Sequence, residues 1–309
     1  MSHTEVAATH WIMRLKIVLI ESMKSWVDHR ASSKGAALAF YTLFSMTPIL
    51  VLAIVVTGYF FGAEAAQGEI VAQVQDLAGA NGAQVIQALL ASARDPVSGL
   101  VATIAASVLL LLSATSVFTE LKESLDELWG IAKPSRSAIH VLLRTRLLSF
   151  GMVLVLAFLL LVSLVISATL ALLEHHAAWV LGSHTAVLAL TSSFITFGVI
   201  ACMFAVIFKT LPDAQLSWYD VWIGAAFTAG LFSLGKYVIG LYLGNSSVVS
   251  SFGAAGSLIA LLLWVYYSAQ IFFLGAEFTR HYALWFGSLQ HERLQGEEMT
   301  RRAAQQAAR

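Results

Sequence analysis

Six long stretches with almost no charged side chains dominate this sequence. Each is long enough for an α-helix to cross the hydrocarbon core of a bilayer, which takes about 20 apolar residues. Only 12% of the 309 residues are charged, too few to cover the water-exposed surface of a soluble chain of this size. The sequence therefore predicts an all-α polytopic membrane protein with six transmembrane helices. The expected spans are 36–61, 97–118, 147–173, 186–208, 221–243 and 253–276.

The positions of lysine and arginine predict how the six helices cross the membrane. Basic residues concentrate on the cytoplasmic side of membrane spans. They occur before the first span, between the second and third, after the fourth and in the tail, whereas the alternate loops together carry only Arg94. We therefore expect a multi-pass protein with both termini in the cytoplasm.

Helical periodicity continues outside the spans. Apolar residues recur from Trp11 to Trp26 with basic residues off that stripe, which predicts an amphipathic helix in the inner membrane interface. Two amphipathic stretches separated by residues 79–82 predict a helical elbow on the outer side. Apolar residues from Phe118 to Leu128 alternate with acids and predict a helix with one acidic face. The expected division is 1–35 for the cytoplasmic N-terminal helix, 36–276 for the six-helix membrane domain and 277–309 for a cytoplasmic tail.

Three segments carry a family resemblance. They are GAALAFYTLFSMTPILVL at 35–52, SVFTELKESLDELWGI at 116–131, and a long segment at 211–280 that begins LPDAQLSWYDVWIGAAF and ends AQIFFLGAEFTR. Together they resemble the YihY/virulence factor BrkB family of bacterial inner-membrane proteins. The resemblance implies a six-helix protein of the bacterial inner membrane. It brings no settled activity, because members have carried the label ribonuclease BN, have been linked to serum resistance or envelope lipids, or have been proposed as transporters.

The charged and metal-binding residues argue against catalysis. A metal-dependent ribonuclease needs clustered histidine and carboxylate ligands, with basic residues for phosphates. The richest group, Glu174, His175, His176 and His184, fits no ligand spacing and is expected on the outer side, away from RNA. A single cysteine, Cys202, excludes an internal disulfide or a multi-cysteine metal site. We therefore expect no enzyme, no cofactor and no nucleic-acid partner.

Lys236 is the basic residue placed deepest in an expected span. A lysine at the bilayer centre costs about 2.5 to 3.5 kcal/mol, so such residues usually face a polar cavity or a partner. Ser233 shares its helical face, and Glu64 or Glu174 is a candidate counter-charge on the outer side. The alternative is that the long lysine stem snorkels to the outer headgroups. With a cavity, Lys236 and Ser233 become candidate binding residues for an anionic headgroup or solute.

The first span carries a second polar group. Tyr41, Ser45 and Pro48 recur at i, i+4 and i+7. Pro48 removes a backbone hydrogen bond, which predicts a kink in the membrane. Kinked helices line binding sites in transporters, although a proline kink is also often merely accommodated. These three residues are candidates for one wall of a cavity.

The last two spans and their connection add further candidates. The uncharged segment from Asn245 to Gly256, which includes Gly253, is either a re-entrant gate or a short connector followed by small residues for helix packing. Gln270 places a polar side chain in the inner half of the last span. Small residues such as Gly224 and Thr228 predict close helix association, within the chain or in a homo-oligomer.

These residues favour an inner-membrane transporter or exporter of an amphipathic or anionic compound, either a lipid or a small solute. The chain has no nucleotide-binding motif, so it is not ATP-driven by itself. Membrane lipids are the expected partners. The alternative is a non-transporting scaffold for envelope assembly or virulence-associated resistance, acting through the amphipathic helix and the acidic face.

Overall fold

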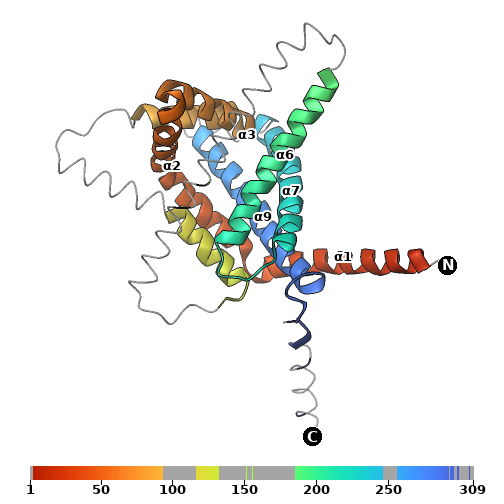
Figure 1. The fold of residues 1–309 in the computed structure, drawn as a ribbon. Coiled ribbons are helices and arrows are strands. Elements are labelled where there is room, and N and C mark those ends of the chain that lie inside the picture. The colour runs from red at the N-terminus through yellow and green to blue at the C-terminus, as the bar shows by residue number, and fades with distance from the viewer. Residues whose placement is uncertain are drawn as a thin grey trace.

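The computed structural model describes residues 3–92, 116–131, 151, 155, 185–245, 256–291, 293–295, 298 and 306 (Figure 1). Within these ranges the chain is helical and has no β-strand, which confirms the all-α prediction for this part. The helices are α1 (His3–Asp28), α2 (Ala31–Phe61), α3 (Ala63–Ser92), α6 (Thr185–Thr210), α7 (Trp218–Asn245) and α9 (Gly256–Trp285). A further helical segment covers 116–128, and we call residues 116–131 the arm.

Among the described residues, three helices are long and apolar enough to cross a membrane. The segments that meet this criterion are Ser193–Thr210 in α6, Trp218–Tyr242 in α7 and Gly256–Trp285 in α9. They coincide with the predicted fourth, fifth and sixth spans, which supports a membrane location. The predicted first span lies in α2, and the second and third fall almost wholly outside the described residues.

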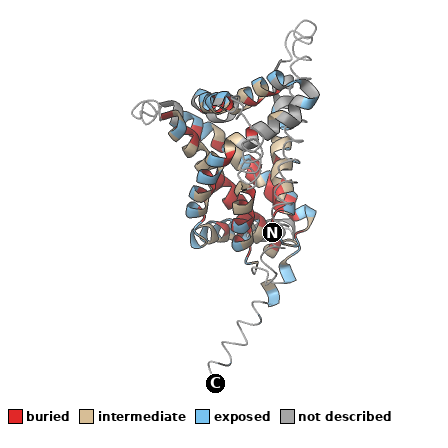
Figure 2. Ribbon diagram, turned by 90° about the vertical axis from the view of Figure 1, so that its left-hand side faces the viewer, coloured by how far each residue is buried: buried red, intermediate tan, exposed pale blue. Residues whose placement is uncertain are grey.

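α9 is the central helix of the described bundle. It packs against α1, α2, α3 and α7, and Figure 1 shows α2 and α7 on different sides of it. α1 runs crosswise at one end of the bundle, and α3 covers the opposite end. Buried residues gather on the inner faces of the helices, whereas the outer faces are exposed (Figure 2). Exposed apolar outer faces are expected of helices surrounded by lipid.

α7 and α9 are held together by a reciprocal pair of glycines and threonines. Thr228 on α7 lies over Gly275 on α9, and Thr279 on α9 lies over Gly224 on α7. Each threonine hydroxyl donates to the carbonyl four residues earlier in its own helix, at 2.7 Å in both cases. A methyl group on either glycine would collide with the opposing threonine. The predicted role of Gly224 and Thr228 in helix packing is therefore confirmed within one chain.

Filling one of these two crossings is expected to separate the helices. Gly275→Ala places a Cβ against Thr228 and should lower the free energy of unfolding in detergent by about 1 to 3 kcal/mol. The matched control is Gly230→Ala on α7, where an added Cβ meets nothing within 4 Å. That control should be neutral or slightly stabilising, because alanine has the higher helix propensity. Equal effects of the two substitutions would contradict the interlock.

The predicted elbow lies in α3. Gly79 has φ 75° and ψ −179°, a non-helical conformation that divides the helix into two limbs. Both limbs pack onto α2 through one apolar cluster of Leu50, Ile70, Ile86 and Leu90. Glycine adopts this positive φ without the penalty that a Cβ would bring. The elbow therefore lets two amphipathic stretches cover the same end of the bundle.

The arm is an amphipathic helix, as predicted. Its apolar residues Leu125 and Leu128 are wholly buried in a core that includes Phe208 of α6 and Phe273 of α9. The helix ends at Leu128, and Gly130 in the turn that follows has φ 68°. The Gly130 amide donates to the Glu127 carbonyl and the Ile131 amide to the Asp126 carbonyl. This pair of bonds is the Schellman arrangement, which satisfies the last carbonyls of a helix.

A strained residue joins α1 to α2. Arg30, between the two helices, has φ 52°, in the left-handed region that disfavours a residue with a Cβ. The turn still keeps its backbone bonds, because the Arg30 amide donates to Val27 and the Ser33 amide to Arg30. The chain thereby changes direction from the crosswise α1 into the bundle helix α2 within two residues.

Replacing this residue with glycine should relieve the strain. We expect Arg30→Gly to raise the free energy of unfolding by about 0.5 to 1 kcal/mol, the penalty of a left-handed residue less the entropy cost of glycine. The same substitution at Arg14, inside α1, should lower it by a similar amount, because glycine is unfavourable in a helix interior. Thermal or detergent unfolding measures both, and the same sign for the two variants would contradict the assignment.

Candidate functional site

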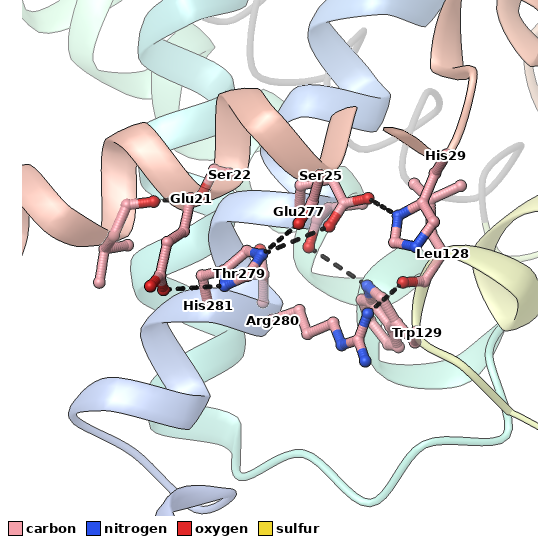
Figure 3. A network of polar contacts seen from close by, with 12 residues as sticks. Glu21, Ser22, Ser25, His29, Leu128, Trp129, Glu277, Thr279, Arg280 and His281 are labelled. Atoms are coloured by element: carbon pink, nitrogen blue, oxygen red, sulfur yellow. Dashed lines mark hydrogen bonds and ion pairs between the residues drawn. The ribbon is translucent and has the colours of Figure 1, made fainter. Parts of the chain in front are cut away.

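The centre of the candidate site is a buried carboxylate near the end of α9 (Figure 3). The side chain of Glu277 is 0% exposed. Its Oε1 lies 2.6 Å from Nδ1 of His29, the residue that follows α1. Its Oε2 is buried and has no hydrogen-bond partner among the described residues. A carboxylate in such a place is costly unless it is paired, so His29 is a structural necessity for the charged form.

His281, one turn along α9, connects Glu277 to the surface. Its Nε2 hydrogen-bonds with Ser25 Oγ at 2.9 Å and lies 3.9 Å from Glu277 Oε2. On the other side of the ring, Nδ1 is 3.5 Å from Oε2 of Glu21. Glu21 is 41% exposed and accepts a 2.6 Å hydrogen bond from the Trp285 indole. A line of titratable groups therefore runs from solvent to the buried carboxylate.

The same turn of α9 also binds the arm. The Arg280 guanidinium donates to the Leu128 carbonyl at 2.6 Å, and the Trp129 indole donates to the Ala276 carbonyl at 3.2 Å. These partners explain why α9 continues to Trp285 and does not stop at Ala276, the expected end of the last span. The expected 277–309 tail therefore begins as an extension of the helix.

A lysine joins the arm to the connection between α6 and α7. Lys122 Nζ lies 2.6 Å from Asp126 Oδ2 and 2.9 Å from Asp213 Oδ2. Asp126 also accepts a hydrogen bond from the backbone amide of Asp213 at 3.0 Å. Burial lowers the pKa of Lys122, but its hydrogen bonds with the two aspartates outweigh burial and raise that pKa above its ordinary value. Asp126 of the predicted acidic face therefore helps to hold the arm in place.

Removing this lysine should loosen the arm. Lys122→Met leaves two carboxylates facing each other without their shared cation and should lower the free energy of unfolding by about 1 to 3 kcal/mol. The control Lys16→Met, at an exposed position on α1, should change it by less than about 0.5 kcal/mol. Limited proteolysis near the arm provides a second readout. Unchanged stability and cleavage of Lys122→Met would contradict the proposed tether.

Gln270 forms a second polar position, inside the bundle. Its side-chain nitrogen and oxygen are both buried, and neither has a hydrogen-bond partner among the described residues. The amide lies against Gly35 of α2, where any side chain would collide with it. An unpaired amide in the middle of a membrane helix costs free energy that water or a polar ligand would recover. Among the predicted binding residues, Gln270 is the one whose described surroundings fit that role most clearly.

The other predicted residues are distributed over several elements. Lys236 and Ser233 are half-buried on α7, next to exposed apolar positions such as Leu234 and Tyr237. On α2, Tyr41 is 40% exposed and Ser45 is buried, whereas Pro48 lies within a helix that continues from Ala31 to Phe61. Asn245 is the last residue of α7, and Gly256 is the buried first residue of α9. Gly253 and the rest of the predicted gate lie outside the described residues.

α9 separates the two predicted binding groups. α2 and α7 each pack extensively on α9, but they are not packed extensively on each other. The Tyr41 group on α2 and the Lys236 group on α7 therefore flank α9 from different sides. Their roles in binding, and the choice between a cavity and snorkelling for Lys236, stay predictions.

The histidines of the buried centre are absent from the sequence-based candidates. The partner of Glu277 is His29, whereas the nearby Arg280 binds a backbone carbonyl. The available signal is the four-residue spacing of Glu277 and His281, which places both on one helix face. His29 has no such signal, because it lies 248 residues away in the chain.

The described residues offer no metal centre. Within the described ranges, no group of three or more histidine, cysteine, aspartate or glutamate side chains is arranged to hold a metal ion. The loop histidines at 175, 176 and 184 lie outside those ranges.

Known proteins resemble this chain over most of its length. The family model described as Virulence factor BrkB matches residues 22–298. The UPF0761 membrane protein of Verminephrobacter eiseniae is 28% identical over 252 residues, which are 80% of this chain and 57% of the relative. The corresponding protein of Acinetobacter baylyi is 24% identical over 261 residues, covering 82% of this chain and 59% of the relative. That of Pseudomonas aeruginosa is 25% identical over 257 residues, covering 81% and 59%.

The chain thus spans less than two thirds of the length of these relatives. No solved structure matches it.

Proposed function

This chain belongs to the virulence factor BrkB family, and from this premise we propose that it moves an amphipathic or anionic compound across a bacterial inner membrane. The compound is a lipid or a small solute, and the protein is a carrier that is neither an enzyme nor dependent on a cofactor. The relatives are named as membrane proteins, which supports the location but specifies no activity.

The observation that carries this proposal is the buried amide of Gln270, which has no hydrogen-bond partner within the part of the chain that the structure describes. Both polar atoms of its side chain are buried where α9 packs against Gly35 of α2, a position that has no side chain. In a protein that only needs to be stable, an apolar residue at this position would avoid the desolvation penalty. A transporter needs polar groups inside the bundle to replace the hydration of its cargo. Gln270 is suited to that task, because an amide offers both a donor and an acceptor.

The proposal includes a topology. We propose six membrane spans with both termini in the cytoplasm, which would place α1, the arm and Glu277 at the cytoplasmic face. The distribution of lysine and arginine supports this orientation. So does α1 itself, whose exposed apolar residues Ile12, Ile20 and Val27 lie on the same helix as exposed Arg14 and Lys24, as in an interfacial helix.

A scaffold role has less support. It would require the acidic face of the arm to be available to a partner. Asp126 instead binds Lys122, and Glu127 lies 2.6 Å from Lys34 of α2. These two acids hold the arm to the rest of the chain, whereas Glu123 on the same helix is exposed to solvent. Charge reversal at Asp126 or Glu127 would therefore disturb the fold before it tested a partner.

Flux in proteoliposomes tests the proposed function. The first probe is fluorescently labelled phosphatidylglycerol, and its exchange between leaflets is followed by chemical bleaching of the label from outside the vesicles. The second probe is carboxyfluorescein trapped inside the vesicles, and its release is followed. We expect at least one probe to move faster than in protein-free vesicles. Gln270→Leu should slow that movement about tenfold, the effect of one lost hydrogen bond of about 1.4 kcal/mol. If neither probe moves faster than in protein-free vesicles, the proposal is wrong.

Stability distinguishes a binding role for Gln270 from a structural one. Leucine has a similar volume and removes the unpaired amide, so Gln270→Leu should raise the free energy of unfolding by about 1 to 3 kcal/mol while it slows flux. The exposed Gln84 on α3 provides the matched control, and Gln84→Leu should leave flux and stability nearly unchanged. A less stable Gln270→Leu protein would indicate that the amide supports the fold.

A further inference from the structure

The His29 and Glu277 contact requires a shared proton. Their atoms are 2.6 Å apart, and a hydrogen bond at that distance needs one hydrogen between the nitrogen and the oxygen. The hydrogen can belong to His29 Nδ1, which then donates to a carboxylate. It can equally belong to Glu277 Oε1, which then donates to a neutral imidazole. Two protonation states therefore fit the same geometry.

Glu277 also has a vacant position for a proton. Its Oε2 is buried and has no hydrogen-bond partner among the described residues, and His281 Nε2 is 3.9 Å away. A small rotation of either side chain would bring these two atoms into hydrogen-bond range. His281 is only 13% exposed, but its other nitrogen lies 3.5 Å from the exposed carboxylate of Glu21. A proton can thus reach Glu277 through one histidine.

The charged groups around Glu277 come from every neighbouring element. α1 contributes Glu21, the turn after it contributes His29, and α9 contributes Arg280 and His281. The arm presents the Leu128 carbonyl, which is bonded to Arg280, while its Glu127 is paired with Lys34 of α2. Asp220 of α7 accepts two hydrogen bonds from Ser288. The two histidines are thus the titratable groups in direct reach of the Glu277 carboxyl.

We infer that Glu277 is a proton-binding site, loaded through His281 and shared with His29, and that its proton drives the transport described above. The coupling of this proton to transport rests on the proposed function, whereas the binding of the proton by Glu277 does not. In the loading step, the Nε2–H bond of protonated His281 breaks and an O–H bond forms on Glu277 Oε2. The imidazolium becomes neutral imidazole and the carboxylate becomes carboxylic acid. The remaining hydrogen of His281 is on Nδ1, the nitrogen that faces Glu21. A flip of the ring therefore turns the unprotonated Nε2 to the Glu21 side, where a hydronium ion protonates it and becomes water.

Protonation of Glu277 would change how α1 is held to α9. A neutral Glu277 no longer attracts a protonated His29, so the tie between α1 and α9 weakens. His29 immediately precedes the strained Arg30, and Gly35 follows six residues after His29 on α2. Gly35 covers the Gln270 amide. Movement of this short segment would therefore open or close the proposed binding position.

Infrared difference spectroscopy on the protein in lipid nanodiscs tests proton binding without any cargo. Between alkaline and acidic buffer, the wild type should gain a carboxylic-acid C=O band that is absent in Glu277→Gln. The matched control, Glu123→Gln in the arm, should keep that band. A spectrum of Glu277→Gln identical to that of the wild type would overturn the inference.

The route of the proton is tested by a pH jump. His281→Phe should retain the Glu277 band but acquire it at least about tenfold more slowly, because the relay is gone. This variant also serves if Glu277→Gln fails to fold. An unchanged rate would show that the proton reaches Glu277 by a path other than His281.

Coupling is tested with the two flux probes under an imposed pH gradient. Wild-type flux should depend on the gradient, whereas Glu277→Gln should show flux that does not. Wild-type flux that ignores the gradient would overturn proton coupling and leave the transport proposal intact. An absence of flux for both probes, together with the Glu277 band, would overturn transport and leave the proton site.

Discussion

The buried carboxylate of Glu277 is the constraint on which one end of the molecule depends. A carboxylate without solvent must receive its partners from other elements, and His29 supplies the direct contact from α1. The neighbouring residues of α9 extend the effect to the arm, since Ala276 accepts a bond from Trp129 and Arg280 donates to Leu128. A single stretch of α9 therefore holds two segments that are far apart in the sequence.

The bundle combines two kinds of helix contact with different mechanical properties. Between α7 and α9 the contact is made by glycines and threonines in close approach, without charge, and it depends on shape alone. Between α1, α2 and α9 it includes titratable groups and the buried amide of Gln270, which has no hydrogen-bond partner among the described residues. Arg30, with its positive φ, lies in the turn between α1 and α2. The first contact is suited to remain fixed, whereas the proposed protonation of Glu277 would change the strength of the second. This division is what a carrier with one rigid and one movable part requires.

Sequence patterns predicted the elements that are determined by residues close together in the chain. The apolar stretches predicted the membrane helices α6, α7 and α9, residues 79–82 predicted the elbow of α3, and the apolar repeat predicted the helix of the arm. Each of these signals is contained within a few turns of one helix. The continuation of α9 to Trp285 was missed because its polar residues looked like the end of a span.

The polar centre was missed for a different reason. Whether Glu277 is buried depends on where α1 lies, and no periodicity in α9 contains that information. Gln270 was recognised as polar within a span, but its lack of a partner became visible only once Gly35 was placed against it. Sequence patterns identify polar residues in a membrane helix, while the pairing of those residues depends on the packing of distant segments.

The central claim is that the contact between His29 and Glu277 holds α1 to α9, and a double-mutant cycle measures it directly. His29→Ala, Glu277→Ala and the double variant would be unfolded in mixed micelles at neutral pH and compared with the wild type. The account predicts a coupling free energy of about 1 to 3 kcal/mol between the two positions. Single effects that add to within about 0.5 kcal/mol would contradict it, because they would show that the two side chains act independently.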